Sequence, residues 1–396
     1  PPPRVPAAGA LRRRVLGCFL VSGWSKSTGT RRHGAGRGPR RGLAAGVVMR
    51  MLGAPLGLAV ACALPGAARA LSTLPSSQRG LSIHLDTIPR LLKCIDACNH
   101  LGDRREEDIV PLVIHGDTVG EVFEETASLL ASSGVFKLSD GVGAGARAGS
   151  GPWLSLAPDL AGAPAEQVTE AVAALTAGLR QEGVVTGWRD ELVAVSPSFG
   201  APPVFEVERA AYPLLGVRGY GIHVNGFTRD PSAPGGLQLW VATRSKQKQT
   251  WPGLRDHIVA GQISGGLSPE ETVVKEAEEE AGIPEALARE ARGTGFVSYR
   301  GVDEQGRLKN DCLFCFDLEL PRDFEPQPVD GEVDSFELWD LNRVLSLLEG
   351  DVEFGEPYKP NCALVVLDFL IRHGVLPPSH PGYLELVSGL RATGQR

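Results

Sequence analysis

The alternation of apolar and polar residues divides the chain into an aperiodic beginning and two periodic regions. Residues 1–48 are rich in Pro, Gly, Ala and Arg and show no periodicity, so no packed core is expected there. From about Leu85 onward, apolar residues recur at spacings typical of helices or strands. We predict helices at Ile88–His100, Gly120–Ser133 and Ala165–Gln181, a strand at Ile109–Asp117 that ends in a turn, and a strand at Leu192–Val195. These elements predict a small α/β domain over residues 85–200.

A second periodic region follows the Pro/Gly/Ser-rich residues 196–203, which are interpreted as a linker. We predict strands in the second half of Val204–Phe227 and at Leu237–Arg244, Asp256–Gly261, Gly295–Tyr299, Asp311–Leu320 and Ser335–Trp339, and helices at Leu341–Leu348 and Ala363–His373. This mixture predicts a second α/β domain over residues 204–376. Residues 377–396 are expected to be a tail with one weak amphipathic helix, and the glycine-rich residues 139–151 a flexible insertion.

The stretch Gly261–Ile283 is predicted to be a loop followed by a short helix. Ser268 is a favourable N-cap residue, and Pro269 suits the first helical position, where no helical hydrogen bond is lost. Gly282 is suited to end the helix, because glycine adopts the left-handed conformation that closes many helices. The sequence therefore defines both ends of this helix.

Three carboxylates share one face of this helix, because Glu276, Glu279 and Glu280 are three and four residues apart. Like charges this close destabilise a helix unless a cation neutralises them, and a divalent metal bound through oxygen atoms would do so. Glutamate-rich faces are more often simply solvated, so the glutamates alone favour an ordinary surface helix. The glycine-bearing loop, the neighbouring Lys275 and the defined helix end shift the balance toward a functional site.

Charge is distributed unevenly along the 396 residues, although the formal net charge is only −7. Residues 1–80 carry thirteen Lys or Arg and no Asp or Glu, which leaves a net charge of −20 on residues 81–396. Such an acidic body argues against binding to nucleic-acid polymers, which requires basic patches. It is compatible with a phosphorylated small molecule that binds through a metal ion.

The seven cysteines do not form a recognisable framework, since their number is odd and their spacing irregular. Cys312 and Cys315 lie in a predicted strand, which directs them to opposite faces. Cys94 and Cys98 lie one turn apart on a predicted helix with no second Cys/His pair nearby, so no zinc site is expected there.

Residues 1–80 read as a leader rather than as part of a folded domain. From Met49 a basic start, an apolar stretch and an A-x-A ending at Ala70 form a signal-peptide pattern that is too short to span a membrane. A serine-bearing segment without acidic residues, Leu71–Gly80, follows it. We interpret this as an organellar address, with the plastid as first choice and the mitochondrion or the secretory pathway as alternatives. Translated noncoding sequence upstream of Met49 also remains open.

The stretch Gly261–Ile283 resembles the Nudix box, G-x5-E-x7-R-E-U-x-E-E-x-G-U, in which U is aliphatic. Without gaps, the defined positions of the motif are occupied here by Gly261, Glu276, Glu279, Glu280, Gly282 and Ile283. Leu267 stands where the motif has its first glutamate, and Lys275 stands where it has arginine. Gln262 stands where the Nudix subfamily described next often has a second glycine.

Further segments resemble one Nudix subfamily, that of plant plastid Nudix hydrolases and the Nudix half of fungal thiamine pyrophosphokinase fusions. They are Glu208–Ala211, His223–Gly226, Leu239–Ser245, Asp256–Gly261, Asp330–Val333 and Lys359–Cys362. Members of this subfamily carry a domain of unknown function ahead of the Nudix domain and commonly lack the first glutamate. The resemblance covers about residues 85–390. It implies a mixed-sheet α/β/α sandwich preceded by a small α/β domain.

The resemblance also implies an activity, the hydrolysis of a diphosphate linked to another group with Mg²⁺ or Mn²⁺ as cofactor. It favours damaged forms of thiamine diphosphate as substrates and monophosphates as products. Oxidised nucleotides of the 8-oxo-dGTP type, or a non-catalytic nucleotide-sensing module, are the alternatives. The expected partner is thus a small molecule, with no nucleic-acid polymer and no stable membrane insertion, and a homodimer is left open.

Roles for individual residues follow from the same resemblance. Glu276, Glu279 and Glu280 are expected to hold the metal, and Lys275 to pair with one of these carboxylates. Glu332 is a candidate general base or extra metal ligand, although an ordinary acidic turn is the simpler alternative. The candidate ligands of the diphosphate are Arg244 and Lys248, with an ordinary solvated turn as the alternative for these two residues. The candidates for stacking on a heterocycle are Trp240, Trp251 or Tyr299.

Overall fold

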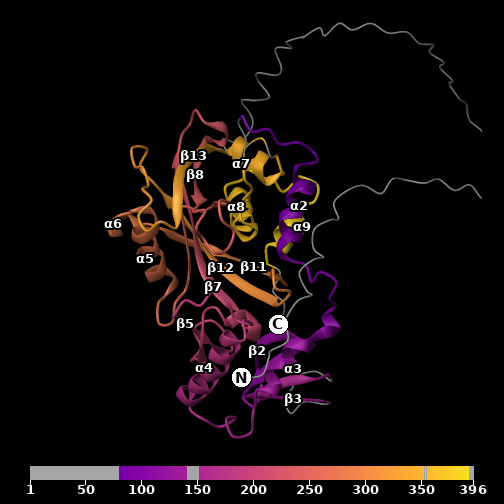
Figure 1. Ribbon diagram of the computed structural model, residues 1–396. Coiled ribbons are helices and arrows are strands. Elements are labelled where there is room, and N and C mark those ends of the chain that lie inside the picture. The colour runs from indigo at the N-terminus through magenta and orange to yellow at the C-terminus, as the bar shows by residue number, and fades with distance from the viewer. Residues whose placement is uncertain (1–79, 141–150, 352, 354, 392–396) are drawn as a thin grey trace, which may run out of the picture. The chain divides into compact units, whose positions relative to one another are not determined.

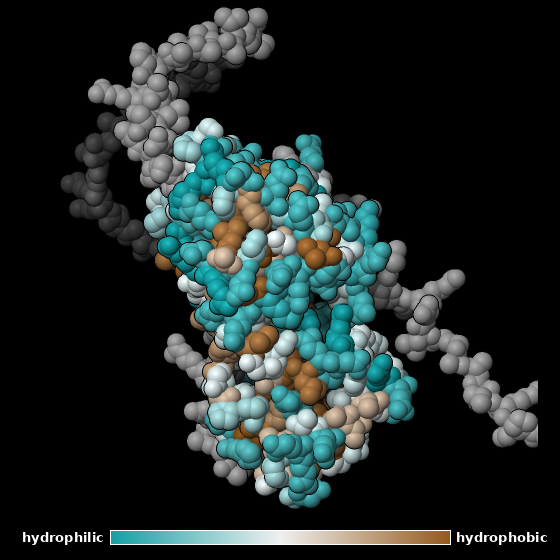
Figure 2. Space-filling model, turned by 90° about the vertical axis from the view of Figure 1, so that its left-hand side faces the viewer, coloured by the Kyte–Doolittle hydropathy of each residue, from teal (hydrophilic) through white to brown (hydrophobic). Residues whose placement is uncertain are grey.

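The computed structural model describes residues 80–140, 151–351, 353 and 355–391. The expected leader and most of the glycine-rich insertion lie outside these residues. Across the described part of the chain, no helix combines the length and apolar character needed to cross a bilayer. Hydrophilic side chains predominate on the face drawn in Figure 2, where apolar side chains form small separate groups.

The small domain is built on a four-stranded sheet with the order β2-β1-β4-β3 (Figure 1). Its strands are β1 (Ile109–Ile114), β2 (Asp117–Phe123), β3 (Phe136–Ser139) and β4 (Trp153–Leu156), and its helices are η2 (Glu106–Asp108), α3 (Glu124–Ser132) and α4 (Ala165–Gln181). β1 pairs antiparallel with β2 and parallel with β4, so the sheet is mixed. Leu130 of α3 and Val172 of α4 are buried in one core with Leu112 and Leu154 of the sheet.

The helix predicted at Gly120–Ser133 is wrong in its first part, because residues up to Phe123 belong to strand β2. β1 and β2 form a hairpin whose turn is made by His115 and Gly116, both with positive φ, 53° and 86°. Two successive residues with positive φ give the turn whose twist suits a two-residue hairpin. Glycine adopts positive φ readily, and histidine is enriched among the other residues found there, so the turn at the end of this strand was predicted but the second strand was not.

Residues 196–203 are not a linker between domains. They connect β5 (Leu192–Val195) to β6 (Phe205–Glu208), and these two strands pair antiparallel. Phe205 is fully buried in the same core as the small-domain sheet, and that core continues as far as Val217. The small-domain core therefore extends past the expected boundary at residue 204.

The large domain contains a seven-stranded mixed sheet with the path β11-β12-β7-β8-β13 (Figure 1). β10 pairs with β7, and β9 with β8. The strands are β7 (Gly219–Arg229), β8 (Leu237–Arg244), β9 (Arg255–Asp256), β10 (Val259–Gln262), β11 (Arg292–Val302), β12 (Leu308–Glu319) and β13 (Val333–Asp340). Only the β12–β7 pair among them is parallel, over the register Asp311↔Gly219 to Glu319↔Phe227.

Helices cover both faces of this sheet, as expected for an α/β/α sandwich. The helical elements are α2 (Thr87–Cys98), η4 (Pro234–Gly236), α5 (Pro269–Ala281), α6 (Glu285–Ala288), α7 (Leu341–Leu348), α8 (Pro360–Arg372) and α9 (Tyr383–Gly389). The short helix η3 (Tyr212–Leu215) belongs to the small-domain core instead. α5 and α6 pack on the face that carries Trp240, while α2, α7, α8 and α9 pack on the face that carries Leu239 and Val241. Alternate residues of β8 thus serve two separate cores.

Two helices that the sequence predicted outside the large domain pack in its core. α2 was expected in the small domain, but its Ile88, Leu91 and Ile95 are buried against α8 and α9. α9 lies in the predicted tail, yet Leu386 is fully buried in the same core. The large domain is therefore completed by segments from both ends of the described chain.

Candidate active site

Helix α5 has the ends that the sequence predicts. Ser268 Oγ accepts a hydrogen bond from Glu271 N at 3.1 Å, and Glu271 Oε2 accepts one from Ser268 N at 2.9 Å, which completes a capping box. Gly282 ends the helix with a φ of 61°. The strand β10 and the loop 263–268 deliver the chain to this helix, so the helix start is fixed against the sheet.

The three clustered glutamates occupy two environments. Glu276 and Glu279 line a cavity of about 550 Å³. Glu280 is only 7% exposed, and its Oε2 accepts a hydrogen bond from the backbone N of Ala260 at 2.9 Å. Burial, together with the nearby carboxylates of Asp256 and Glu276, raises the pKa of Glu280 well above its usual value. Burial likewise raises the pKa of Glu276.

Lys275 bridges the two glutamates that face the cavity. Its Nζ lies 3.1 Å from Glu276 Oε1 and 2.8 Å from Glu279 Oε2. Partial burial acts in the opposite direction, but these two hydrogen bonds raise the pKa of Lys275 above its usual value. The contacts have the geometry expected if lysine takes the motif's arginine position, although an ammonium group lacks the planar fork of arginine.

Gly261 is required by the close approach of Glu276. A Cβ atom at position 261 would lie 2.6 Å from Glu276 Cγ and 2.7 Å from Cδ, well inside van der Waals contact. The first glycine of the motif therefore leaves the space that the glutamate stem occupies. This contact ties the end of strand β10 to the face of α5 that carries Glu276.

The loop before α5 is anchored by the small domain. Arg209 Nε donates to Gln262 Oε1 at 2.7 Å, and the Arg209 guanidinium also pairs with Glu191 at 2.7 Å. The hydroxyl of Ser264 donates a short hydrogen bond to the same Glu191 carboxylate. The cavity is consequently lined by residues of both domains, including Arg189 and Arg209 from the small domain. Arg209 lies in Glu208–Ala211, one of the segments that carried the family resemblance, but no role at the cavity was predicted for it.

Arg244 lines the cavity but is already committed to protein partners. It donates to the carbonyl oxygens of Trp251 at 3.0 Å and Thr250 at 3.1 Å, and to Asp256 Oδ2 at 2.6 Å. Arg244 thus holds the 250–251 loop in place, and its guanidinium is paired with protein groups rather than left unpaired for a phosphate. Lys248, in contrast, lines the cavity and pairs with Glu332, which lines it as well.

Glu332 lines the same cavity as Glu276 and Glu279. Its partial burial would raise the pKa, but the hydrogen bond and positive charge of Lys248 lower it below the usual value. At neutral pH this residue is therefore a carboxylate. It can accept a proton once its contact with Lys248 loosens.

The expected aromatic contacts are placed differently by the structure. Trp240 packs in the core beneath α5, and Tyr299 is buried with its hydroxyl donating to Asp311 Oδ2 at 2.7 Å, so neither has a face open to the cavity. Both point inward because they occupy core-facing positions of their strands. Trp251 lines the cavity and is 37% exposed, and Tyr220 lines it as well.

Two cations that the sequence pattern did not single out complete the cavity. Lys359 precedes helix α8 and makes no ion pair within 4 Å among the described residues. Lys309 lies 3.1 Å from Asp311. Lys359 lies in a segment that carried the family resemblance, which is the signal by which it could have been found.

Comparison with known proteins assigns both domains. The NUDIX domain family matches residues 221–362, and a domain of unknown function, DUF4743, matches residues 90–219. Nudix hydrolase 20, chloroplastic, from Arabidopsis thaliana is 41% identical over 299 residues, which cover 75% of this chain and 76% of that protein. Nudix hydrolase 24, chloroplastic, from the same plant is 41% identical over 302 residues, which cover 76% of this chain and 77% of that protein.

Among solved structures, the NUDIX domain of Shewanella oneidensis NrtR complexed with ADP ribose is 16% identical, with a TM-score of 0.31. The match covers 39% of this chain and 88% of that chain. The assignment itself rests on the matched family domain and on the two plant relatives, which are similar over most of their length. The chain therefore belongs to the Nudix hydrolase family and is a pyrophosphohydrolase.

Proposed function

We propose that this protein hydrolyses a diphosphate linkage in a small molecule that carries a heterocycle. Damaged, oxidised analogues of thiamine diphosphate are the proposed substrates, and monophosphates the products. The observation that carries the proposal is the composition of one cavity, in which Glu276 and Glu279 face the same space as Lys248 and Lys359. A diphosphate requires both kinds of group, carboxylates that bind a metal and cations that contact its oxygen atoms.

Nudix hydrolases generally depend on a divalent metal ion, and the residues of α5 fit one. Glu276, Glu279 and Glu280 would hold Mg²⁺ or Mn²⁺, which prefer oxygen ligands. A cation here would also neutralise the charge that burial makes unfavourable on Glu280. When bound, the ion supplies Lewis-acid activation of water and neutralises phosphate charge.

The chain's own residues provide the remaining chemistry. Lys275 holds the side chains of Glu276 and Glu279 in place through its two hydrogen bonds. Glu332 is the proposed general base, because it is a carboxylate in the same cavity and can take a proton from the attacking water. Lys248, released from Glu332, then becomes available to a substrate phosphate oxygen.

The heterocycle is proposed to lie against Trp251 and Tyr220. The ring of Tyr220 packs against that of Phe199, with their centroids 4.9 Å apart. The backbone at Trp251 is held by the hydrogen bond from Arg244 to its carbonyl oxygen. Aromatic faces beside cationic side chains suit a flat ring joined to a diphosphate.

Substrate choice is tested by a panel of diphosphates assayed with Mg²⁺ on the full chain. The panel comprises thiamine diphosphate, its oxidised analogues, 8-oxo-dGTP, ADP-ribose and NADH, and the measurement is kcat/KM from released phosphate or monophosphate. We expect the highest kcat/KM for an oxidised thiamine analogue. A clear preference for 8-oxo-dGTP or ADP-ribose would refute the substrate class. Binding of a nucleotide without metal-dependent turnover of any compound would instead indicate a sensing module.

Delivery to a plastid is also proposed, since the two plant relatives are named chloroplastic and the leader reads as an organellar address. A fluorescent fusion of residues 49–85 should accumulate in plastids of plant cells. Diffuse cytosolic fluorescence of that fusion would contradict the assignment.

A further inference from the structure

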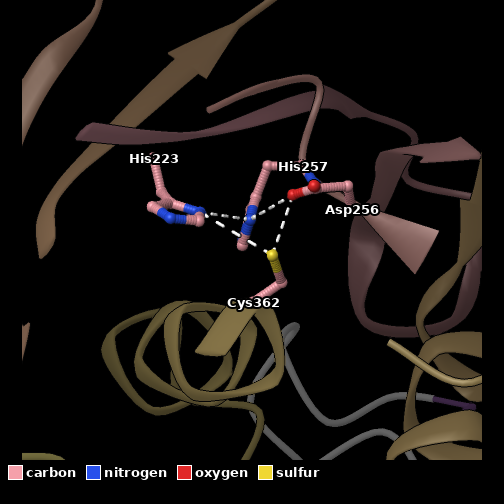
Figure 3. A group of neighbouring side chains, drawn as sticks. All are labelled: His223, Asp256, His257 and Cys362. Carbon is pink, nitrogen blue, oxygen red and sulfur yellow. Dashed lines mark hydrogen bonds and ion pairs between the residues drawn. The ribbon is translucent and has the colours of Figure 1, made fainter. Parts of the chain in front are cut away.

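Four polar side chains meet in the interior of the large domain, beside the cavity (Figure 3). They come from β7, from the end of β9 and the residue after it, and from the first turn of α8, and they are His223, Asp256, His257 and Cys362. All four residues are buried. Each presents one atom of a kind that binds metals, and these four atoms lie within 4.8 Å of one another.

Four of the six separations between these atoms lie between 2.8 and 3.9 Å. His223 Nδ1 lies 2.9 Å from His257 Nδ1 and 3.9 Å from Cys362 Sγ. Asp256 Oδ1 lies 2.8 Å from Cys362 Sγ and 3.8 Å from His257 Nδ1. Zinc–ligand bonds of 2.0–2.3 Å in a tetrahedral site place neighbouring ligand atoms roughly 3.3–3.8 Å apart. Small side-chain movements would therefore bring all four atoms to bonding distance from one central ion.

The two imidazoles of this cluster depend on a single shared proton. Two histidine Nδ1 atoms 2.9 Å apart can share only one proton, so one of them must act as the acceptor. One ion that binds both Nδ1 atoms would end this dependence and would engage the carboxylate and the thiol at the same time. His257 Nε2, which is buried without a hydrogen-bond partner among the described residues, is not one of the proposed ligand atoms.

We propose that His223, Asp256, His257 and Cys362 bind one Zn²⁺ ion. Two imidazoles, a carboxylate and a thiolate form a mixed N/O/S set, which suits Zn²⁺ and does not suit the oxygen-preferring Mg²⁺. The carboxylate and the thiolate together balance the charge of a divalent ion. On binding, Cys362 Sγ loses its proton to solvent, and the proton between the two Nδ1 atoms moves to Nε2 of the same ring.

The proposed ion would be connected to the catalytic cavity through Asp256. The second oxygen of this carboxylate accepts a hydrogen bond from Arg244, which in turn holds the carbonyl oxygen of Trp251. Outer contacts of this kind orient metal ligands and are sensitive to loss of the metal. Zinc at this position would therefore fasten α8 to the sheet and fix the 250–251 loop. One of its ligands, His223, also lines the cavity.

Metal content of the full chain tests the proposal independently of its hydrolase activity. The protein is loaded with Zn²⁺, dialysed against metal-free buffer and analysed by inductively coupled plasma mass spectrometry. We expect about one Zn²⁺ per chain, as a closed four-ligand site requires. Loading with Co²⁺ should give a thiolate-to-cobalt absorption band in the near ultraviolet. Zinc in hundredfold excess over its Kd should raise the Tm of unfolding by about 5 °C.

Matched variants assign the ion to this cluster. Cys362→Ser and His257→Gln should lose the zinc, and Cys362→Ser should lose the cobalt band. Cys315→Ser, at another fully buried free thiol, and Glu279→Gln, on the glutamate helix, should keep both. Less than about 0.1 Zn²⁺ per wild-type chain after loading would overturn the proposal. So would a full equivalent that survives in both Cys362→Ser and His257→Gln, and the wild-type measurement stands even if these variants fail to fold.

Discussion

Arg209 donates a hydrogen bond to Gln262 Oε1 at 2.7 Å, and this contact joins the small domain to the loop that leads into the glutamate helix. Gln262 is the last residue of β10 and directly follows Gly261, against which Glu276 packs. A side chain at position 262 is therefore not a defect of the loop, because the small domain holds it. The positioning of the helix-borne carboxylates depends on this contact between domains.

The first prediction concerns that contact. Arg209→Met should lower kcat/KM about tenfold, which corresponds to about 1.4 kcal/mol of transition-state stabilisation, because the loop loses both its link to Gln262 and its indirect link through Glu191. The measurement is steady-state kinetics on the best substrate of the diphosphate panel. The control is Arg229→Met, which removes an exposed pair with Glu319 far from the loop. Equal effects of the two substitutions would show that the contact has no special role.

The second prediction concerns the proposed metal ligands. Glu279→Gln and Glu280→Gln should each reduce kcat by a factor of about 10² or more at fixed Mg²⁺, since an amide oxygen is a weaker ligand than a carboxylate. Glu278→Gln, on the same helix but exposed, removes the same charge and should leave kcat within about twofold. Wild-type rates in both Glu279→Gln and Glu280→Gln would refute the assignment of these residues.

The third prediction concerns pH and stability in the absence of divalent metal. Burial raises the pKa of Glu280 well above its usual 4.5, so the folded protein holds this proton more tightly than the unfolded chain. Stability from this group is therefore greatest below pH 4.5 and falls as pH rises from there toward the raised folded-state pKa. Each unit of pKa difference costs about 1.4 kcal/mol at high pH.

Thermal unfolding in chelator checks this pH dependence. Glu280→Gln can still accept the hydrogen bond from Ala260 but cannot ionise, so its Tm relative to wild type should rise between pH 4.5 and 8. Saturating Mg²⁺ should remove the advantage, because a bound cation stabilises the wild-type carboxylate. A Tm difference that stays constant with pH would contradict the assigned cause.

The helix and its ends could be predicted from the sequence because their signals are local. The N-cap at Ser268, the stop at Gly282 and the spacing of the glutamates lie within a few turns of one another, and the structure confirms the helix at Pro269–Ala281. The strands of the large domain were predicted for the same reason, since alternation along one strand is visible without its neighbours.

The remainder depends on contacts between residues far apart in the sequence. The strand conformation of residues 120–123 and the burial of α2 against α8 leave no local signal, because each is decided by contacts with other elements. Trp240 and Tyr299 were expected to face a ligand, but a strand residue faces the core or a cavity according to its register. The cluster of His223, Asp256, His257 and Cys362 was not predicted, because the spacing of these residues along the chain is not one that is typical of a metal site.

The last prediction concerns Gly261. Gly261→Ala places a Cβ atom 2.6 Å from Glu276 Cγ, so the glutamate stem must move and its hydrogen bond with Lys275 must change. Because Cγ is not the free end of the side chain, a change of rotamer at the carboxylate alone cannot relieve the contact. We expect kcat/KM to fall by about tenfold or more, since misplacement of about 1 Å in a catalytic group can cost 10²-fold.

A matched glycine distinguishes this effect from a general response to alanine. Gly178 lies in helix α4, and a Cβ atom added there would meet no neighbouring atom within 4 Å, so Gly178→Ala should raise stability by about 0.4–1 kcal/mol and leave kcat/KM unchanged. The informative comparison is the ratio of the two kcat/KM values at equal fractions of folded protein. If Gly261→Ala retains wild-type kcat/KM, Glu276 does not need its present position for catalysis, and its assignment as a metal ligand falls with that result.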